Sequence, residues 1–256
     1  MIMNKRAIFF FIILFLILIS CSPKTVSVVK VIDGDTVIIS TGEKVRYIGI
    51  NAPEMGEPFY MEAKRENRKL VLGKEVELEF DREERDQYKR LLAYIFVGDT
   101  FINYELLRRG VALIYRDRYN KAHRNLLLEA EREARENRIG LWEDFHKYSV
   151  RIERINYNPE GRDEENLNGE YVVLKNISKE GMNLSNFRIK DESHNVFIFP
   201  EGSYIDGEGE VVIYTGKGFT GNNKFYWDHK TPVWNNDHDT VYLMDANGSV
   251  VDLYRY

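Results

Sequence analysis

The stretch "RYIGINAPE", residues 46–54, joins a strand-like run to a rigid polar turn. Its β-branched and aromatic residues predict a strand that reaches Ile50. Asn51 then opens a turn in which Pro53 restricts the backbone just before Glu54. Such a turn holds its polar groups in a fixed relation to the strand. We therefore interpret the stretch as a preorganised polar site at the end of a β-strand.

The residues around this stretch predict short strands followed by helices. Strand-like runs at 26–32, 36–40 and 45–50 are separated by "DGD" and "TGE" turns. Helical patterns follow, with Gly73 and Gly110 as stop signals for the first two. Extended runs lie between the first two helices. The predicted helices cover 58–73, 102–110 and 119–138, and the further strands lie within 74–80 and 90–103.

After Trp142 the pattern changes to short strands separated by Gly, Asn, Asp and Ser clusters. Their spacing near ten residues predicts an all-β sandwich. The expected domains are 26–147 and 150–256, joined near residues 147–151. The strands of the second domain are expected at 169–176, 186–191, 196–200, 210–216, 240–245 and 250–254.

Charge is unevenly distributed between these segments. Residues 24–148 carry 23 basic and 23 acidic side chains, whereas residues 149–256 carry 11 basic and 18 acidic ones, a net charge of −7. An acidic surface repels a polyphosphate, so nucleic-acid chemistry is expected in the first domain. The five histidines are scattered and predict no metal site: His123, His146, His194, His229 and His238.

The N-terminus has the composition of an export signal. Lys5 and Arg6 precede an apolar run over residues 7–19, which ends at Ser20 and Cys21. The sequence "LISC" resembles the cleavage box of bacterial lipoproteins. This resemblance implies a signal peptide over 1–20, lipid attachment at Cys21 and a short linker over 21–25. The alternative is an uncleaved N-terminal anchor, and both alternatives imply an extracytoplasmic location.

Four motifs of the first domain together suggest phosphodiester chemistry. They are "DGDT" (33–36), Arg46, "NAPE" (51–54) and "DQYKR" (86–90). Carboxylate, amide and carbonyl oxygens suit Ca²⁺ or Mg²⁺, and two arginines suit a phosphate. A metal ion, a carboxylate base and two guanidinium groups are what phosphodiester hydrolysis requires. Each motif alone also has an ordinary structural explanation, such as a hairpin turn for "DGD".

These motifs, in this order over residues 26–142, resemble the staphylococcal-type thermonucleases. "VRYIGINAPE", "RDQYKRLLAY", "INYELLRRG" and "AEREARENRIGLW" carry the resemblance. It implies a five-stranded OB-type barrel with three helices. It also implies Ca²⁺-dependent hydrolysis of DNA or RNA with little sequence preference and 3′-phosphorylated products. The implied catalytic residues are Arg46, Glu54 and Arg90; the metal ligands are Asp35, Asn51 and the Ala52 carbonyl; and the substrate-binding residues are Tyr88 and Tyr115.

Asn51 departs from the resemblance, because founding members carry an acidic ligand at this position. An amide oxygen can bind Ca²⁺ but brings no charge, so we expect activity to need more Ca²⁺. The departure also leaves open a catalytically inactive thermonuclease fold that serves as a binding module at the cell surface. The presence of Arg46, Glu54 and Arg90 favours the enzyme over this alternative.

The second domain resembles the lamin-tail family, an immunoglobulin-like sandwich. "EYVVLKN" and "VWNNDHDTV" carry this resemblance, which covers residues 150–253. It implies a binding or positioning role with an unidentified partner. The whole sequence thus predicts a monomeric, lipid-anchored nuclease with nucleic acid as substrate and the membrane as a second partner. A surface adhesion protein in which the sandwich has the essential role is a further alternative.

Overall fold

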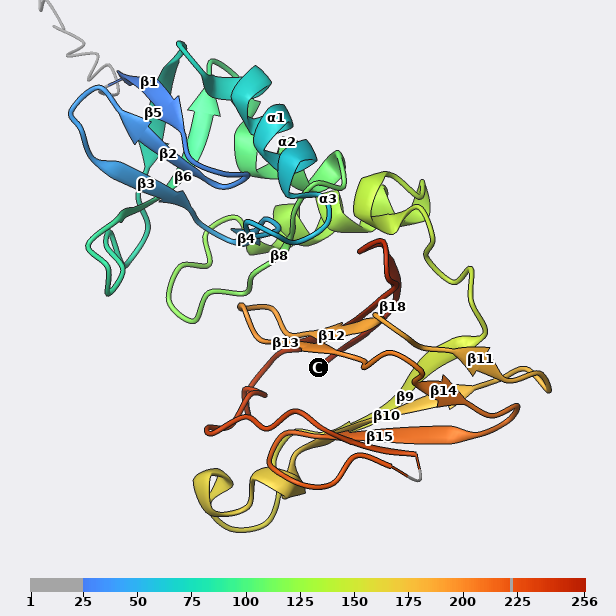
Figure 1. The fold of residues 1–256 in the computed structure, drawn as a ribbon. Coiled ribbons are helices and arrows are strands. Elements are labelled where there is room, and N and C mark those ends of the chain that lie inside the picture. The colour runs from blue at the N-terminus through green and yellow to red at the C-terminus, as the bar shows by residue number, and fades with distance from the viewer. Residues whose placement is uncertain (1–24, 222) are drawn as a thin grey trace, which may run out of the picture.

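The computed structural model describes residues 25–221 and 223–256 of the 256-residue chain. The predicted signal peptide over 1–20 and the predicted lipidation site Cys21 lie outside the described residues. In the described part, no helix has the length and apolar character needed to cross a membrane. The chain forms a mixed domain and an all-β domain that lie one above the other (Figure 1).

The first domain is built on a closed five-stranded barrel, as predicted. Its strands follow the order β3-β2-β1-β5-β6, and parallel pairing of β3 with β6 closes the barrel. A short strand β7 pairs antiparallel with the end of β6, while β4 pairs with β8 outside the barrel. The bounds are β1 Thr25–Val31, β2 Thr36–Ile39, β3 Lys44–Tyr47, β4 Ile50–Asn51, β5 Glu75–Glu79, β6 Leu91–Val97, β7 Thr100–Phe101 and β8 Leu113–Ile114.

The predicted continuous strand over 45–50 is wrong in one respect. Strand β3 ends at Tyr47, and a turn at Ile48 and Gly49 separates it from β4. Gly49 has a φ of +80°, which a residue with a side chain rarely adopts. The turn redirects the chain, so that the "NAPE" segment starts on β4 rather than on the barrel strand.

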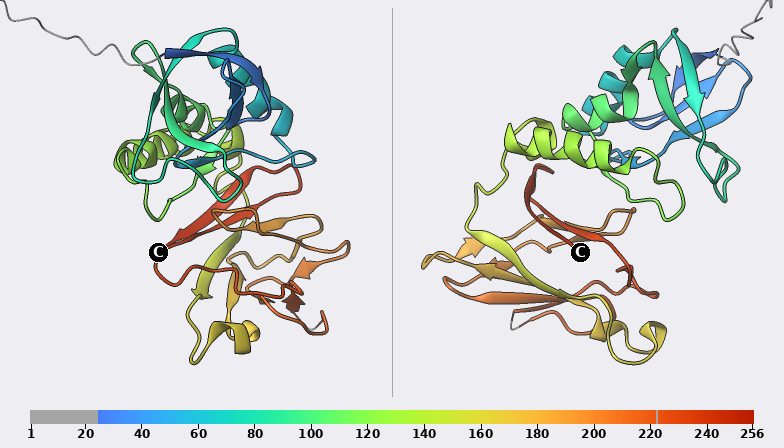
Figure 2. Two further views of the ribbon diagram at one scale, coloured as in Figure 1. Left: turned by 90° about the vertical axis from the view of Figure 1, so that its left-hand side faces the viewer. Right: turned by 180° about the vertical axis from the view of Figure 1, so that it is seen from behind.

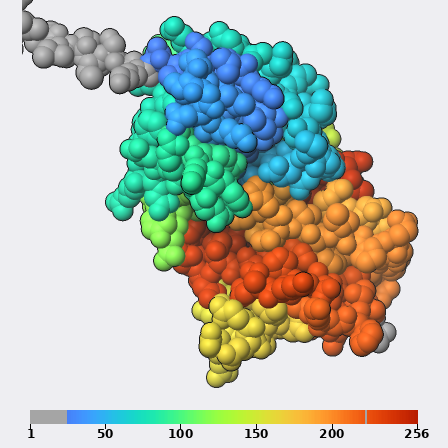
Figure 3. Space-filling model, turned by 60° about the vertical axis from the view of Figure 1, so that its left-hand side comes forward, coloured from blue at the N-terminus to red at the C-terminus, as the bar shows by residue number. Residues whose placement is uncertain are grey.

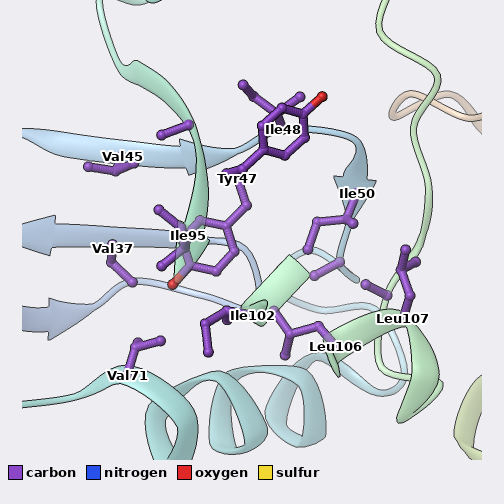
Figure 4. Close-up of a cluster of buried hydrophobic side chains, with 14 of the residues drawn as sticks. Val37, Val45, Tyr47, Ile48, Ile50, Val71, Ile95, Ile102, Leu106 and Leu107 are labelled. Carbon is purple, nitrogen blue, oxygen red and sulfur yellow. The ribbon is translucent and has the colours of Figure 1, made fainter. Parts of the chain in front are cut away.

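Three helices cover the barrel core, also as predicted. Figure 4 shows side chains of the barrel strands, among them Val37 and Ile95, above residues of the helical segments such as Val71 and Leu106. These side chains are fully buried, so the helices close one side of the barrel. The helices are α1 Tyr60–Val71, α2 Ile102–Arg108 and α3 Arg124–Glu136, followed by the 3₁₀ turn η1 Gly140–Trp142.

Helix α3 begins five residues later than the predicted start at residue 119. The carboxylate of Asp117 accepts hydrogen bonds from the backbone N–H groups of residues 119 and 120. Asp81 accepts those of residues 121 and 122. Because these side chains satisfy the backbone donors, the segment is stable as a loop.

The second domain is a β-sandwich with one core between two four-stranded sheets. One sheet has the order β16-β15-β10-β9 and the other β13-β12-β17-β18. The six predicted strands are confirmed as β10, β12, β13, β15, β17 and β18. The bounds are β9 Val150–Asn156, β10 Tyr171–Asn176, β11 Met182–Asn183, β12 Arg188–Lys190, β13 Val196–Ile198, β14 Tyr204–Ile205, β15 Glu210–Tyr214, β16 Lys224–Tyr226, β17 Thr240–Met244 and β18 Val250–Arg255, with 3₁₀ turns η2 Asp163–Glu165 and η3 Leu167–Gly169.

The two domains are in direct contact. Figure 2 shows β18 directly below α3 and the small β4–β8 pair, and Figure 3 shows the surfaces of the two domains meeting. A hydrophobic cluster contains Trp142 from the first domain and Tyr242 from the second, both fully buried. Beside it, Glu131 of α3 accepts hydrogen bonds from Tyr242 at 3.2 Å and from Arg255 at 2.6 Å. The interface is therefore packed like a core and contains a buried ion pair.

Candidate active site

The "DGD" turn lies directly against the "NAPE" turn. A Cβ on Gly34 would lie 2.5 Å from the Cβ of Ala52, so this approach requires glycine. Asp35 is buried, and its Oδ2 accepts a hydrogen bond of 2.6 Å from the backbone N–H of Ala52. The Thr36 hydroxyl donates to the other carboxylate oxygen at 3.0 Å. Two segments 17 residues apart in sequence are thus joined through one carboxylate.

Arg46 extends from β3 into the same network. Its Nη1 lies 3.3 Å from Asp35 Oδ2 and donates to the Tyr47 carbonyl at 2.9 Å. Its Nη2 donates to Asn51 Oδ1 at 3.1 Å. The guanidinium is therefore fixed by three partners, and its side chain is 10% exposed. This is the preorganisation expected of a phosphate-binding arginine.

Glu54 lies at the outer end of the "NAPE" turn, with its side chain 55% exposed. Its backbone N–H donates to Glu57 Oε2 at 2.9 Å. The Nζ of Lys190, from β12 of the second domain, donates to both carboxylate oxygens of Glu57 at 3.0 Å. The second domain therefore holds the turn that presents Glu54.

A surface cleft of about 710 Å³ contains the other predicted site residues. Arg90 is held by Asp86, whose Oδ2 accepts from Arg90 Nε at 2.6 Å. The Arg90 guanidinium carbon lies 5.6 Å from the centre of the Tyr88 ring, which is highly exposed. The cleft thus places two arginines beside exposed aromatic rings. Its lining includes Arg46, Asn51, Tyr88, Arg90, Tyr115 and, from the second domain, Ser193 and His194.

His194 is a site residue that the sequence analysis missed. It belongs to the loop between β12 and β13, and its Nδ1 lies 3.5 Å from Glu54 Oε1. Burial lowers the pKa of His194, although the Glu54 carboxylate opposes this effect. The sequence has no signal that places His194 at the site, because two residues 140 positions apart leave no local pattern when they meet.

The predicted metal ligands supply hard oxygen donors. Asp35 is buried and the neighbouring Asp33 is half-buried, and desolvation followed by the Asp35 charge raises the pKa of Asp33 to about 6. The Ala52 backbone adjoins Asp35. The Asn51 amide oxygen accepts from Arg46 instead. Within residues 25–221 and 223–256, no group of three or more His, Cys, Asp or Glu side chains could hold a metal ion. The oxygen atoms of Asp35, Asn51 and Ala52 are of the kind that binds Ca²⁺, but only Asp35 among these three brings a negative charge.

The structure brings most of the predicted residues into one neighbourhood. Asp35, Arg46, Asn51 and Ala52 share a hydrogen-bond network, and Arg46 lines the same cleft as Arg90. Glu54 joins this region through the turn and through His194. The individual roles of these residues stay predictions, as does the substrate role of Tyr88 and Tyr115.

Comparisons with known proteins identify both parts of the chain. The family model "Staphylococcal nuclease homologue" matches residues 44–144, and the "Lamin Tail Domain" model matches residues 145–256. The thermonuclease of Staphylococcus intermedius is 36% identical over 44% of this chain and 73% of the relative. The thermonuclease of Staphylococcus hyicus is 30% identical over 48% of this chain and 78% of the relative.

A third relative is an uncharacterized endonuclease of Haemophilus influenzae, 34% identical over 56% of this chain and 82% of the relative. These relatives match the nuclease part, and the family models match the two domains in the order in which the structure contains them. The chain therefore belongs to the staphylococcal nuclease homologue family and is a nuclease whose catalytic domain is followed by a lamin tail domain.

Proposed function

We propose that the chain hydrolyses phosphodiester bonds of DNA, RNA or both with Ca²⁺ as cofactor and little sequence preference, leaving 3′-phosphorylated ends. The supporting observation is that Arg46 and Arg90 line one cleft next to the turn that carries Glu54. A cleft of about 710 Å³ is large enough for a nucleotide. Its exposed Tyr88 offers a stacking surface for a base or sugar.

In this proposal the two arginines bind the scissile phosphate. The Arg46 guanidinium is already oriented by Asp35 and Asn51, so little ordering is needed when substrate binds. Arg90, held by Asp86, contributes a second positive group from the opposite segment of the cleft. Negative charge that develops on the phosphate oxygens is stabilised by both, more in the transition state than in the ground state.

Glu54 is the proposed general base. It takes a proton from the attacking water, the new bond forms between that oxygen and phosphorus, and the bond to the 5′ oxygen breaks. The phosphate stays on the 3′ side, and the 5′ oxygen leaves with a proton from solvent. Asp35 and the Ala52 carbonyl are the proposed Ca²⁺ ligands, with Asn51 as a neutral ligand. When bound, Ca²⁺ supplies positive charge to the phosphate and polarises the water.

The test is digestion of DNA and RNA by the full chain with Ca²⁺ and with a chelator. The products are analysed by mass spectrometry for 3′-phosphate ends. Glu54→Gln is the active-site variant, and Glu62→Gln, a half-buried glutamate of α1 outside the cleft lining, is the matched control. Cleavage that persists with chelator, or in Glu54→Gln, would contradict the proposal. A chain that binds nucleic acid without cleaving it would be the binding module instead.

We also propose that the chain is attached to a membrane through lipid on Cys21 and faces away from the cytoplasm. The support is the basic start, the apolar run over 7–19 and the "LISC" box. Expression of the full precursor with and without Cys21→Ser tests this by detergent phase partitioning. The parent should enter the detergent phase and the variant should not. Equal partitioning would leave an uncleaved anchor as the explanation.

A further inference from the structure

The loop between β12 and β13 bridges the two loops that border the cleft. We define this segment, residues 191–195, as the tail hairpin. Glu192 is buried, and its two carboxylate oxygens accept hydrogen bonds from Arg116 N at 2.8 Å and Arg116 Nε at 2.6 Å. Arg116 directly follows Tyr115, which lines the cleft. On one side, the tail hairpin therefore holds the segment that carries Tyr115.

On the other side of the cleft, Asn51 of the "NAPE" turn binds the backbone of the tail hairpin. Its Nδ2 donates to the carbonyl of Ser193 at 2.5 Å and to that of Glu192 at 3.2 Å. Its Oδ1 meanwhile accepts from Arg46. An aspartate at this position would have no donor for the two carbonyls. The contacts thus give a physical reason for an amide here, since it satisfies a guanidinium and a second domain simultaneously.

The tail hairpin forms a wall of the cleft without filling it. His194 is 57% exposed and Glu54 is 55% exposed, so both side chains remain accessible. Among the described residues, the ring's polar contact is the one between Nδ1 and Glu54. This leaves Nε2 available to a ligand in the cleft that His194 shares with Arg46, Tyr88 and Arg90.

We propose that the lamin tail domain supplies a substrate-binding residue to the nuclease site. In the complex the His194 ring lies between two negative groups, Glu54 and a phosphate, and carries a proton on each nitrogen, so that its Nε2 donates a hydrogen bond to a phosphate oxygen of the bound strand. The proposal rests on the proposed function, since it assigns the strand to this cleft. Asn51 and Glu192 position the tail hairpin, and His194 itself contacts the substrate. The active site is then formed by both domains, although the second domain carries a net charge of −7.

The test compares steady-state kinetics of the full chain with those of His194→Ala and His194→Gln. A hydrogen bond to a charged group is worth roughly 10-fold or more in binding. We expect His194→Ala to raise KM for single-stranded DNA about 10-fold with little change in kcat, and His194→Gln to restore part of the loss through its amide N–H. His229→Ala, a half-buried histidine of the same domain that lines a different surface hollow, is the matched control.

A binding measurement separates this proposal from the proposed function. Fluorescence anisotropy of a labelled single-stranded oligonucleotide is measured in the presence of chelator for the full chain with and without His194→Ala, so that Glu54 stays in place beside the ring. A rise in Kd of about 10-fold supports the contact even if the parent shows no cleavage. Unchanged KM and Kd would overturn it. A fall in kcat alone would overturn it, because His194 would then position Glu54 and not bind the strand. A gain in activity would also overturn it, because His194 would then obstruct the cleft.

Discussion

The two walls of the cleft come from different domains and are built differently. The barrel wall carries Arg46, Asp35 and Asn51 on neighbouring segments of one fold, joined by short hydrogen bonds. The tail wall carries Ser193 and His194 on the tail hairpin, and Lys190 on the adjoining strand β12 holds the turn through Glu57. The barrel wall contains the groups expected to act on the phosphate. The tail wall fixes the "NAPE" turn and adds the proposed contact between His194 and the substrate. The second domain therefore belongs to the site rather than being an independent attachment.

This comparison also bears on truncation of the chain. Removal of residues 150–256 would expose Trp142 and leave Glu131 without Tyr242 and Arg255. Both effects cost stability, because a buried apolar cluster and a buried ion pair lose their partners. Point variants within the full chain therefore test the two walls more cleanly than deletion.

The largest expected effect is on the barrel wall. Glu54→Ala and Arg90→Ala should each lower kcat by at least about 10²-fold, the usual scale for a general base or a charge-stabilising donor. Both side chains are partly exposed, so the fold should survive. Arg65→Ala on α1, a highly exposed arginine, is the control. Near-normal kcat in either folded variant would remove that residue from the catalytic assignment.

The next effect concerns the contact that keeps the walls together. Arg255→Ala leaves the buried carboxylate of Glu131 without its cation. We expect a loss of about 3 kcal/mol in the free energy of unfolding. Denaturant unfolding followed by tryptophan fluorescence and far-UV circular dichroism measures this loss. Arg154→Ala removes an exposed pair with Glu210 and should cost under about 1 kcal/mol. Equal losses in the two variants would mean that the domains are weakly coupled.

Asn51→Asp should separate the positioning role of Asn51 from its predicted metal role. The substitution removes both hydrogen bonds to the tail hairpin, and we expect a loss of about 2 kcal/mol in unfolding free energy without Ca²⁺. If Asn51 also ligates Ca²⁺, the added charge should lower the half-saturating Ca²⁺ concentration for cleavage. Unchanged stability would contradict the hairpin contact, and an unchanged or higher half-saturating concentration would contradict the ligand role.

Lys190→Met should affect catalysis from a distance. It removes the ammonium that holds Glu57, which in turn holds the backbone of Glu54. We expect kcat to fall about 10-fold, because a misplaced base loses alignment with the water. Lys175→Met, a half-buried lysine of β10 that pairs with Glu210, is the control. A kcat equal to that of the control would show that Glu54 is positioned by the barrel wall alone.

The smallest effect is a pH dependence of stability from the tail hairpin. Burial, followed by the charge of Asp239, raises the pKa of Asp191 from 3.8 to about 7. Because the folded pKa is the higher one, its stabilising effect is full below pH 3.8 and is lost as pH rises through 7. Stability should fall by about 1 kcal/mol from this group between pH 6 and 8. Asp191→Asn should remove that part of the slope in thermal unfolding, and an unchanged slope would contradict the assignment.

Local patterns in the sequence predicted the strands of the first domain, the three helices and the six principal sandwich strands, while the resemblance to thermonucleases implied the barrel. They also identified the barrel wall, because Asp35, Arg46 and Asn51 lie within 17 residues of one another. The tail wall could not be predicted, since Asn51 and Glu192 are 141 residues apart in sequence and meet through tertiary packing. The late start of α3 was missed for a similar reason. Its loop is stabilised by Asp81, 40 residues away.

The claim that both domains form one site is tested most directly by a double-mutant cycle across their boundary. The cycle measures kcat for the parent, Glu57→Ala, Lys190→Met and the double variant at saturating Ca²⁺. Because Lys190 acts through Glu57, each single variant should lower kcat, and the double variant should be no slower than Glu57→Ala. The expected coupling in activation free energy is about 1 kcal/mol. Additive effects, or a Lys190→Met kcat equal to the parent's, would contradict the claim.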